Sequence, residues 1–243
     1  MTSEVSNQYA DIDLTEEQIQ EALRAAREKE YFRRRHEAYL ASLTTERQYP
    51  QFKAEELMDF FKMQYQVDDA NRAVVANLCF YFSGDKRFNG DLNKGLLLSG
   101  GVGVGKTSLM QFFARNQIFS YRMVHCRDVE KNFAQDGYEA IDKYSNNPPV
   151  AINANPFGHQ IIGFCFDDLG TEENSKHYGK EKNMMAEILL NRYDFKLPYH
   201  STHITTNLTA AEIKEQYGTR VTDRLREMVN VITFDKNTQS RRK

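Results

Sequence analysis

The sequence predicts an α/β protein in which a parallel β-sheet is flanked by helices and preceded by an α-helical N-terminal region. Two observations lead to this prediction. From Gly95 onward, short apolar runs alternate with helical stretches, which is typical of parallel strands joined by helices. Before Gly95, apolar residues recur mainly at helical spacing.

The composition fits a globular protein and excludes several classes. The 243 residues carry 32 Lys and Arg against 34 Asp and Glu, for a formal net charge of −2. A chain of this length buries a core without metal or disulfide support, and Cys79, Cys126 and Cys165 form no CxxC pair. Neither a secretory signal nor an apolar run of the ~18–20 residues needed to cross a bilayer is present. We therefore expect a cytoplasmic protein with no membrane partner.

A long, charge-balanced helix is expected near the N-terminus. Thr15 and Gln18 match a capping box, and apolar residues then recur at helical spacing to about Leu43. Residues 15–47 carry seven acidic and seven basic side chains. The arginines at 33–35 could form a nucleic-acid patch, but the neighbouring glutamates favour a solvated helix face.

The N-terminal region is expected to continue as a pair of helices, near 54–65 and 69–83, which lead into a loop at 84–94. A domain boundary is therefore predicted within about 65–92, with the alternative that the helical pair leads into the second domain. We assign residues 1–90 to a helical, partner-binding region and residues 91–243 to the α/β domain.

The α/β domain is predicted to contain five strands and five main helices. The expected strands are 95–99, 121–126, 161–167, 202–206 and 229–234. The expected helices lie near 106–115, 128–135, 181–195, 209–216 and 219–228, and 145–159 is expected to be a long loop.

A phosphate-binding loop follows the first of these strands. The run Gly100, Gly101, Val102, Gly103, Val104, Gly105, Lys106 and Thr107 fits the pattern G-x-x-x-x-G-K-[ST], and Ser108 continues into the next helix. Its glycines let backbone N–H groups wrap around phosphates at the helix N-terminus. Lys106 would reach the β- and γ-phosphates of ATP, and the Thr107 hydroxyl would bind Mg²⁺. The alternative is an ordinary glycine turn, which the strand–loop–helix context disfavours.

A second acidic element stands at the end of another apolar run. The expected strand 161–167 is an apolar run that ends in Asp167, and Asp168 follows it. Beside a phosphate loop, Asp167 would hold Mg²⁺ and Asp168 would polarise the attacking water. The alternative is a polar turn after a core strand, since Asp-Leu-Gly is good turn chemistry.

With these elements in order, residues 95–234 resemble the AAA+ ATPases, and among them the DnaC/DnaI helicase loaders and the transposition helper IstB. The resemblance rests on residues 103–107 and 166–170, and on three further stretches at 191–193, 205–208 and 220–225. It implies a P-loop NTPase fold that binds ATP and Mg²⁺, acts in DNA replication and forms a homo-oligomer in the ATP state. The implied partners are a replicative helicase, or a transposase, and DNA in its single-stranded form.

The resemblance also implies roles for single residues. Asn207 matches the sensor-1 residue that helps hold the attacking water, with a helix N-cap as the alternative interpretation. Arg220 and Arg224 share one helical face, and Arg224 best matches the arginine finger that reaches the ATP of a neighbouring subunit. An ordinary solvated arginine is the alternative. A full C-terminal lid is not expected, and Arg241 is a weaker candidate for sensor 2 because its spacing from the last strand departs from the family pattern.

One alternative function lies in the same superfamily, and two belong to other classes. An IstB-like helper would act with a transposase. A small-molecule phosphotransferase would need an arginine-bearing lid, and residues 168–200 offer no candidate for one beyond Lys180 and Lys182. A nucleotide-gated adaptor with negligible hydrolysis is disfavoured by the intact Lys106 and Asp168.

His200 and His203 could form a metal pair, but no third ligand stands at suitable spacing. Residues 219–243 carry seven bases against three acids, so the near-zero net charge does not exclude DNA.

Overall fold

The structure is a computed structural model and describes residues 13, 15–44, 52–116, 120–147, 163–172, 175–177, 180–235 and 238–241. By its internal contacts the chain forms two compact units, Met1–Arg47 and Gln48–Lys243. The long loop expected at 145–159 lies mostly outside the described residues.

The described part of the first unit is essentially one helix, α1 (Glu16–Thr44). The expected capping box is present: Thr15 N donates to Gln18 Oε1 at 3.0 Å, and Gln18 N donates to Thr15 Oγ1 at 3.3 Å. Arg33 and Arg34 both pair with Glu30 on the exposed surface of the helix. These pairs favour the solvated-face interpretation of the arginine run.

The second unit contains a five-stranded parallel sheet with the order β2-β3-β6-β1-β7. Its strands are β1 (Gly95–Ser99), β2 (Tyr121–His125), β3 (Gly163–Leu169), β6 (Thr202–Thr206) and β7 (Val229–Thr233). All five expected strands are therefore confirmed. The third extends two residues beyond the predicted end, so that both aspartates lie within it.

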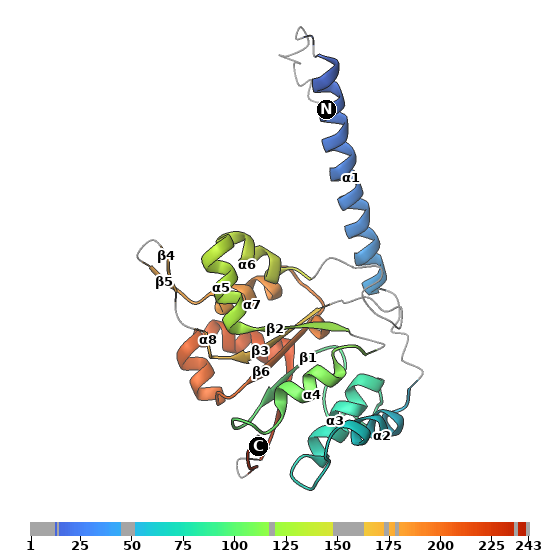
Figure 1. Cartoon of the computed structure of the whole chain (residues 1–243), viewed down its shortest axis with the longest axis vertical. Coiled ribbons are helices and arrows are strands. Elements are labelled where there is room, and N and C mark those ends of the chain that lie inside the picture. The colour runs from blue at the N-terminus through green and yellow to red at the C-terminus, as the bar shows by residue number, and fades with distance from the viewer. Residues whose placement is uncertain are drawn as a thin grey trace, which may run out of the picture. The chain divides into compact units, whose positions relative to one another are not determined.

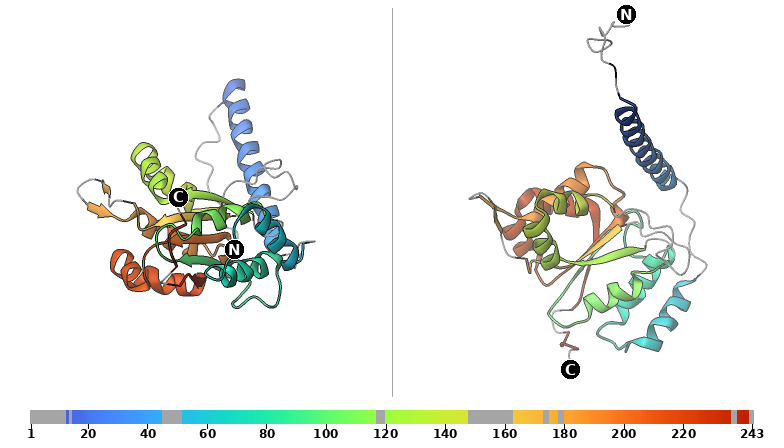
Figure 2. Two further views of the ribbon diagram at one scale, coloured as in Figure 1. Left: turned by 60° about the horizontal axis from the view of Figure 1, so that its bottom comes forward. Right: turned by 45° about the horizontal axis from the view of Figure 1, so that its top comes forward.

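Helices cover both faces of the sheet (Figures 1 and 2). Leu96 and Leu98 of β1 pack in a core with α2 (Ala54–Gln64), α3 (Arg72–Ser83) and α4 (Lys106–Phe113). Leu97 points to the opposite core, as the alternation of a strand requires. That core contains α5 (Cys126–Asp136), α6 (Tyr138–Ser145), α7 (Met184–Asp194) and α8 (Ala210–Met228). The predicted α/β fold is confirmed.

The two compact units meet after Arg47, whereas the sequence predicts a division at residue 90. Helices α2 and α3 belong to the compact unit of the sheet, because Phe61, Leu78 and Phe82 pack with Leu98 and Phe113 in one core. The helical pair is therefore part of the α/β unit.

Three local features were not predicted. Helix α6 lies where the sequence showed no clear signal, and a short antiparallel hairpin, β4 (Ser175–His177) and β5 (Lys180–Lys182), occupies the predicted start of the 181–195 helix. The 3₁₀ turn η1 (Tyr199–Ser201) precedes β6. The two helices expected at 209–216 and 219–228 are present as the two arms of α8, which is kinked at Gly218 with φ of 83°.

A buried arginine ties α7 to its neighbours. Arg192 is fully buried and donates to Thr202 Oγ1 at 2.9 Å, to Ser201 O at 2.9 Å and to the carbonyls of Tyr144 and Asn146, both at 3.1 Å. These bonds join the ends of α6 and α7 to the start of β6. Arg192 is therefore a structural residue.

The described residues after β7 contain no helix. Arg241 N donates to Gly103 O at 2.9 Å, so this tail returns to the loop after β1. No helix in the described part of the chain is long and apolar enough to cross a bilayer.

Candidate nucleotide-binding site

The loop between β1 and α4 has the backbone that phosphate binding requires. Gly103 and Gly105 have φ of 80° and 105°, values that residues with side chains rarely adopt. Gly105 is the N-cap of α4 and has no side chain to satisfy the free N–H groups of the first turn. These N–H groups and the helix dipole make the loop a site for an anion.

Lys106 lies inside this loop. Its Nζ donates to Gly100 O and Gly101 O, both at 2.8 Å, and to Asn207 Oδ1 at 2.6 Å. The ammonium group is therefore held beneath the loop by residues that directly follow β1 and β6. Asn207 is thus brought to the predicted phosphate-binding lysine.

The carboxylate of Asp167 is fixed by two hydroxyl groups. Thr107 Oγ1 donates to Asp167 Oδ1 at 3.0 Å, and Thr205 Oγ1 donates to the same oxygen at 2.6 Å. Asp167 is fully buried at the carboxyl end of β3. The hydroxyl and the carboxylate that the sequence assigns to Mg²⁺ therefore lie next to each other.

A bulge in β3 brings the second aspartate to the same side. Phe166 pairs with Ile204 and Leu169 with Thr206, so β3 has one extra residue between these pairs. Asp168 occupies this irregularity with φ of 56°, and its N–H donates to Thr205 Oγ1 at 2.9 Å. In a regular strand the two neighbouring side chains would point to opposite faces. Here both aspartates lie at the phosphate loop.

The donor set fits a magnesium ion. Asp167 Oδ2 is buried and makes no well-aligned hydrogen bond among the described residues, although His125 Nδ1 lies 3.0 Å away. Mg²⁺ prefers oxygen ligands and is usually held by one or two protein groups together with phosphates and waters. The Thr107 hydroxyl and the Asp167 carboxylate supply such oxygens.

A cavity of about 160 Å³ opens over these groups. Its lining combines loop residues with side chains from three separate parts of the chain: Val102, Gly103, Gly105, Lys106, Thr107, Ser108, Asp168, Asn207 and Arg241. The interpretation of Asn207 as a helix cap is wrong, because Thr209 is the N-cap of α8 and accepts from Glu212 N. The cavity has the charge and size of a phosphate site.

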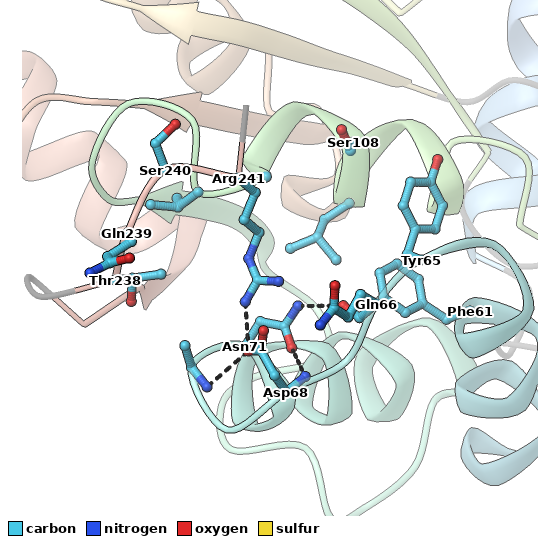
Figure 3. Close-up of a pocket in the computed structure, with 14 residues that line it drawn as sticks. Phe61, Tyr65, Gln66, Asp68, Asn71, Ser108, Thr238, Gln239, Ser240 and Arg241 are labelled. Carbon is cyan, nitrogen blue, oxygen red and sulfur yellow. Dashed lines mark hydrogen bonds and ion pairs between the residues drawn. The ribbon is translucent and has the colours of Figure 1, made fainter. Parts of the chain in front are cut away.

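A second cavity of about 720 Å³ adjoins the loop and is shown in Figure 3. The α2–α3 region, the start of α4 and the C-terminal tail line it, through Phe61, Tyr65, Gln66, Asp68, Ala70, Asn71, Val104, Gly105, Ser108, Leu109, Thr238, Gln239, Ser240 and Arg241. Gly105, Ser108 and Arg241 line both cavities. Its aromatic and amide side chains are suited to a planar, polar-edged group such as a nucleotide base.

Arg220 and Arg224 are absent from the linings of both cavities. Arg220 pairs with Asp194 at 3.4 Å, and the Arg224 guanidinium lies 4.2 Å from the centre of the Tyr193 ring. Both arginines therefore contact the end of α7, which confirms that they share one face of α8.

The histidine pair shows no sign of a metal site. His203 is fully buried, and its Nδ1 accepts from Leu96 N at 3.2 Å. Burial, together with the nearby His200 and Arg192, lowers the pKa of His203 to about 3. Within the described residues, no three His, Cys, Asp or Glu side chains are grouped as metal ligands.

Sequence reasoning missed Thr205, His125 and Asp68. A signal for His125 was available, because it ends β2 and Asp167 lies near the end of β3, and the carboxyl ends of parallel strands meet at one edge of the sheet. Thr205 could be found only through the bulge, and Asp68 only through the packing of α2 and α3.

No protein-family model and no curated protein matches the sequence. Among solved structures, the DnaC helicase loader is similar with 20% identity and a TM-score of 0.46, over 72% of this chain and 96% of that one. A DNA replication initiation factor is similar with 14% identity and a TM-score of 0.48, over 76% of this chain and 50% of that one. The replication initiator DnaA bound to AMPPCP and single-stranded DNA is similar with 14% identity and a TM-score of 0.47, over 79% of this chain and 52% of that one. The chain thus spans about half of the two initiator structures, and at these identities their functions do not carry over to it.

Proposed function

We propose that the chain is a Mg²⁺-dependent ATPase that works as an accessory protein of DNA replication, of the helicase-loader kind. The observation that carries the ATPase assignment is the contact between Thr107 Oγ1 and Asp167 Oδ1, 3.0 Å apart beneath a glycine loop with Lys106 at its centre. A plain glycine turn needs neither the hydroxyl nor the carboxylate, whereas a phosphate–magnesium site needs both.

In this proposal each group has one task. The loop N–H groups and Lys106 bind the phosphates and balance their charge. Thr107 and Asp167 would hold Mg²⁺, which supplies further neutralisation of phosphate charge when bound. Asp168 accepts a proton from, or orients, the attacking water, and Asn207 holds that water in line. The 720 Å³ cavity receives the base.

Arg224 is proposed to act across a subunit interface. It lies on α8 outside both cavities, and its Nε is buried without a hydrogen bond among the described residues. A guanidinium that reaches the ATP of a neighbouring subunit stabilises the charge of the transferring phosphoryl group. The active form is therefore a homo-oligomer, in which Arg220 lies beside the same interface.

The replication role is the finer part of the proposal. It is supported by the order of motifs from Gly103 to Leu225, which resembles the helicase loaders. Residues 1–90 would bind the replicative helicase, through α1 and the surface of α2 and α3. The ATPase domain would bind single-stranded DNA, for which the basic C-terminal tail provides charge.

The partner is tested with the full chain immobilised in the presence of ATP and Mg²⁺. We expect it to retain a purified hexameric helicase, with Lys106→Ala as the nucleotide-free control, and single-stranded DNA to raise the hydrolysis rate. Retention of a transposase in place of the helicase would assign the chain to the transposition helpers. A hydrolysis rate that does not change when DNA is added, together with phosphate transfer to a small acceptor, would overturn the replication role.

A further inference from the structure

Arg241 occupies the junction of the two cavities. It lines both the phosphate cavity and the larger base cavity, and its N–H is bonded to Gly103 O of the phosphate loop at 2.9 Å. The backbone of the tail is therefore fixed against the loop. Its side chain lies where the two cavities meet.

The guanidinium of Arg241 is held by an acidic side chain from the connection between α2 and α3. Arg241 Nη2 donates to Asp68 Oδ1 at 2.6 Å, and the pair is partly shielded, with side-chain exposures of 27% and 39% (Figure 3). The hydrogen bond from Arg241 lowers the pKa of Asp68. Arg241 Nε is buried and has no hydrogen-bond partner within the described residues. In the Arg241 guanidinium, Nη2 is thus paired with Asp68, whereas Nε has no acceptor among the described residues.

Asp68 also organises the start of α3. Its Oδ1 accepts from Ala70 N at 3.1 Å, and its carbonyl accepts from Arg72 N at 2.9 Å. Asn71 Oδ1 in turn accepts from Asp68 N at 2.9 Å. A change at the Asp68 carboxylate therefore reaches the turn that begins α3.

We propose that Asp68 is a positioning residue that competes with the terminal phosphate of ATP for Arg241. Without a γ-phosphate, Asp68 holds the guanidinium at the junction. A γ-phosphate in the cavity beside Lys106 and Thr107 carries more charge and more acceptor oxygens than a carboxylate, so it takes Arg241 from Asp68. The connection between α2 and α3 then differs between the ATP and ADP states. This inference rests on the proposed nucleotide site.

The test compares the affinities of a non-hydrolysable ATP analogue and of ADP, measured by calorimetry with Mg²⁺ present. Asp68→Asn keeps an Oδ1 acceptor for the Ala70 N–H but removes the charge that holds Arg241. We expect it to bind the ATP analogue about three to ten times more tightly and to change ADP binding less than about twofold. The matched control is Asp69→Asn, which removes the same charge from an exposed neighbour 3.8 Å from Arg72 and should alter neither affinity.

Arg241→Ala examines the pair from the other side, with little effect on the core. It should lower the preference for the ATP analogue over ADP, and adding Asp68→Asn to it should produce no further change. Equal effects of Asp68→Asn on both nucleotides, or an effect that persists without Arg241, would overturn the competition. Failure of the wild-type chain to bind any nucleotide would overturn the proposed function and this inference with it.

Discussion

Thr205 holds both acidic residues of the site, one through its carboxylate and the other through its backbone. Its hydroxyl donates to Asp167 Oδ1 and accepts from Asp168 N, so one oxygen sets the carboxylate on one side and the bulged backbone on the other. Thr206 makes a similar pair of bonds one residue later, to Leu169 O and from Leu208 N, without touching a carboxylate. The two threonines therefore form a natural pair of test and control.

Replacing Thr205 with valine should lower the turnover of ATP about 10- to 100-fold, the usual loss when a group that orients a ligand is removed. Thr205→Val and Thr206→Val should each lower the free energy of unfolding by about 1–3 kcal/mol, because both leave buried polar groups without a partner. Steady-state hydrolysis and urea unfolding measure the two effects. Equal loss of turnover in both variants would mean that Thr205 acts only through stability.

His203 gives the fold a dependence on pH. Its pKa in the folded chain is about 3, against an ordinary value of 6.5, because burial disfavours the charged ring. Between these values the unfolded chain binds more protons, so the stability from His203 is complete above pH 6.5 and decreases as the pH falls toward 3. The slope for one such group is about 1.4 kcal/mol per pH unit.

The corresponding prediction concerns the difference between the wild type and His203→Gln. As the pH is lowered from 6.5 to 5, the free energy of unfolding should decrease less steeply in His203→Gln than in the wild type. The difference in slope should be about 1.4 kcal/mol per pH unit, whatever the stability of the variant at pH 7. Parallel curves for the two proteins would show that His203 is not the titrating group.

At the scale of elements, the sheet and the phosphate loop could be predicted because their signals are local. The strands are short apolar runs, and the loop is a contiguous motif with a strand before it and a helix after it. Helix α6 was missed because the run from Tyr138 to Ser145 is only two turns long and no element was assigned between the helix expected at 128–135 and the loop expected at 145–159. The β4–β5 hairpin was missed because residues such as Lys180 and Lys182 show no apolar alternation.

The rest of the site depends on contacts between distant residues. The bond from Lys106 to Asn207 spans 101 positions, and that from Arg241 to Asp68 spans 173. No spacing rule applies over such separations. Helices α2 and α3 were assigned to the N-terminal region for the same reason, since helical periodicity shows which face is apolar but not what covers it.

Helix α2 offers a direct test of that place. Phe61 is buried and packs edge-to-face with Phe112 of α4, with ring centres 5.0 Å apart. Phe61→Ala should lower the free energy of unfolding of the α/β unit by about 3–5 kcal/mol. Met63 of the same helix is 79% exposed, and Met63→Ala should change the free energy of unfolding by less than about 0.5 kcal/mol. If Phe61→Ala is as stable as the wild type, α2 does not contribute to the core of the α/β unit.

At the scale of the whole molecule, the position of Arg224 outside both cavities connects hydrolysis to assembly. Arg224→Ala should bind ATP normally but lose at least about 10³-fold in hydrolysis rate, the lower range for an arginine finger. Asp168→Asn should be inactive for a different reason, because it removes the group that acts on the water. Mixing the two variants should restore part of the activity, since some interfaces then combine an intact Asp168 with an intact Arg224. Absence of any recovery on mixing would count against an arginine finger that acts between subunits.

The binding of ATP by the wild type, Lys106→Ala and Lys94→Ala tests the central claim most directly. Lys94 is a control of the same charge, whose Nζ donates to Arg226 O at 3.1 Å, outside both cavities. Calorimetry with Mg²⁺ should show ATP binding by the wild type and by Lys94→Ala, and a loss of about 100-fold for Lys106→Ala, because charge-assisted bonds to the phosphates are removed. An unchanged affinity in Lys106→Ala, or no binding by the wild type, would contradict the assignment of a nucleotide site.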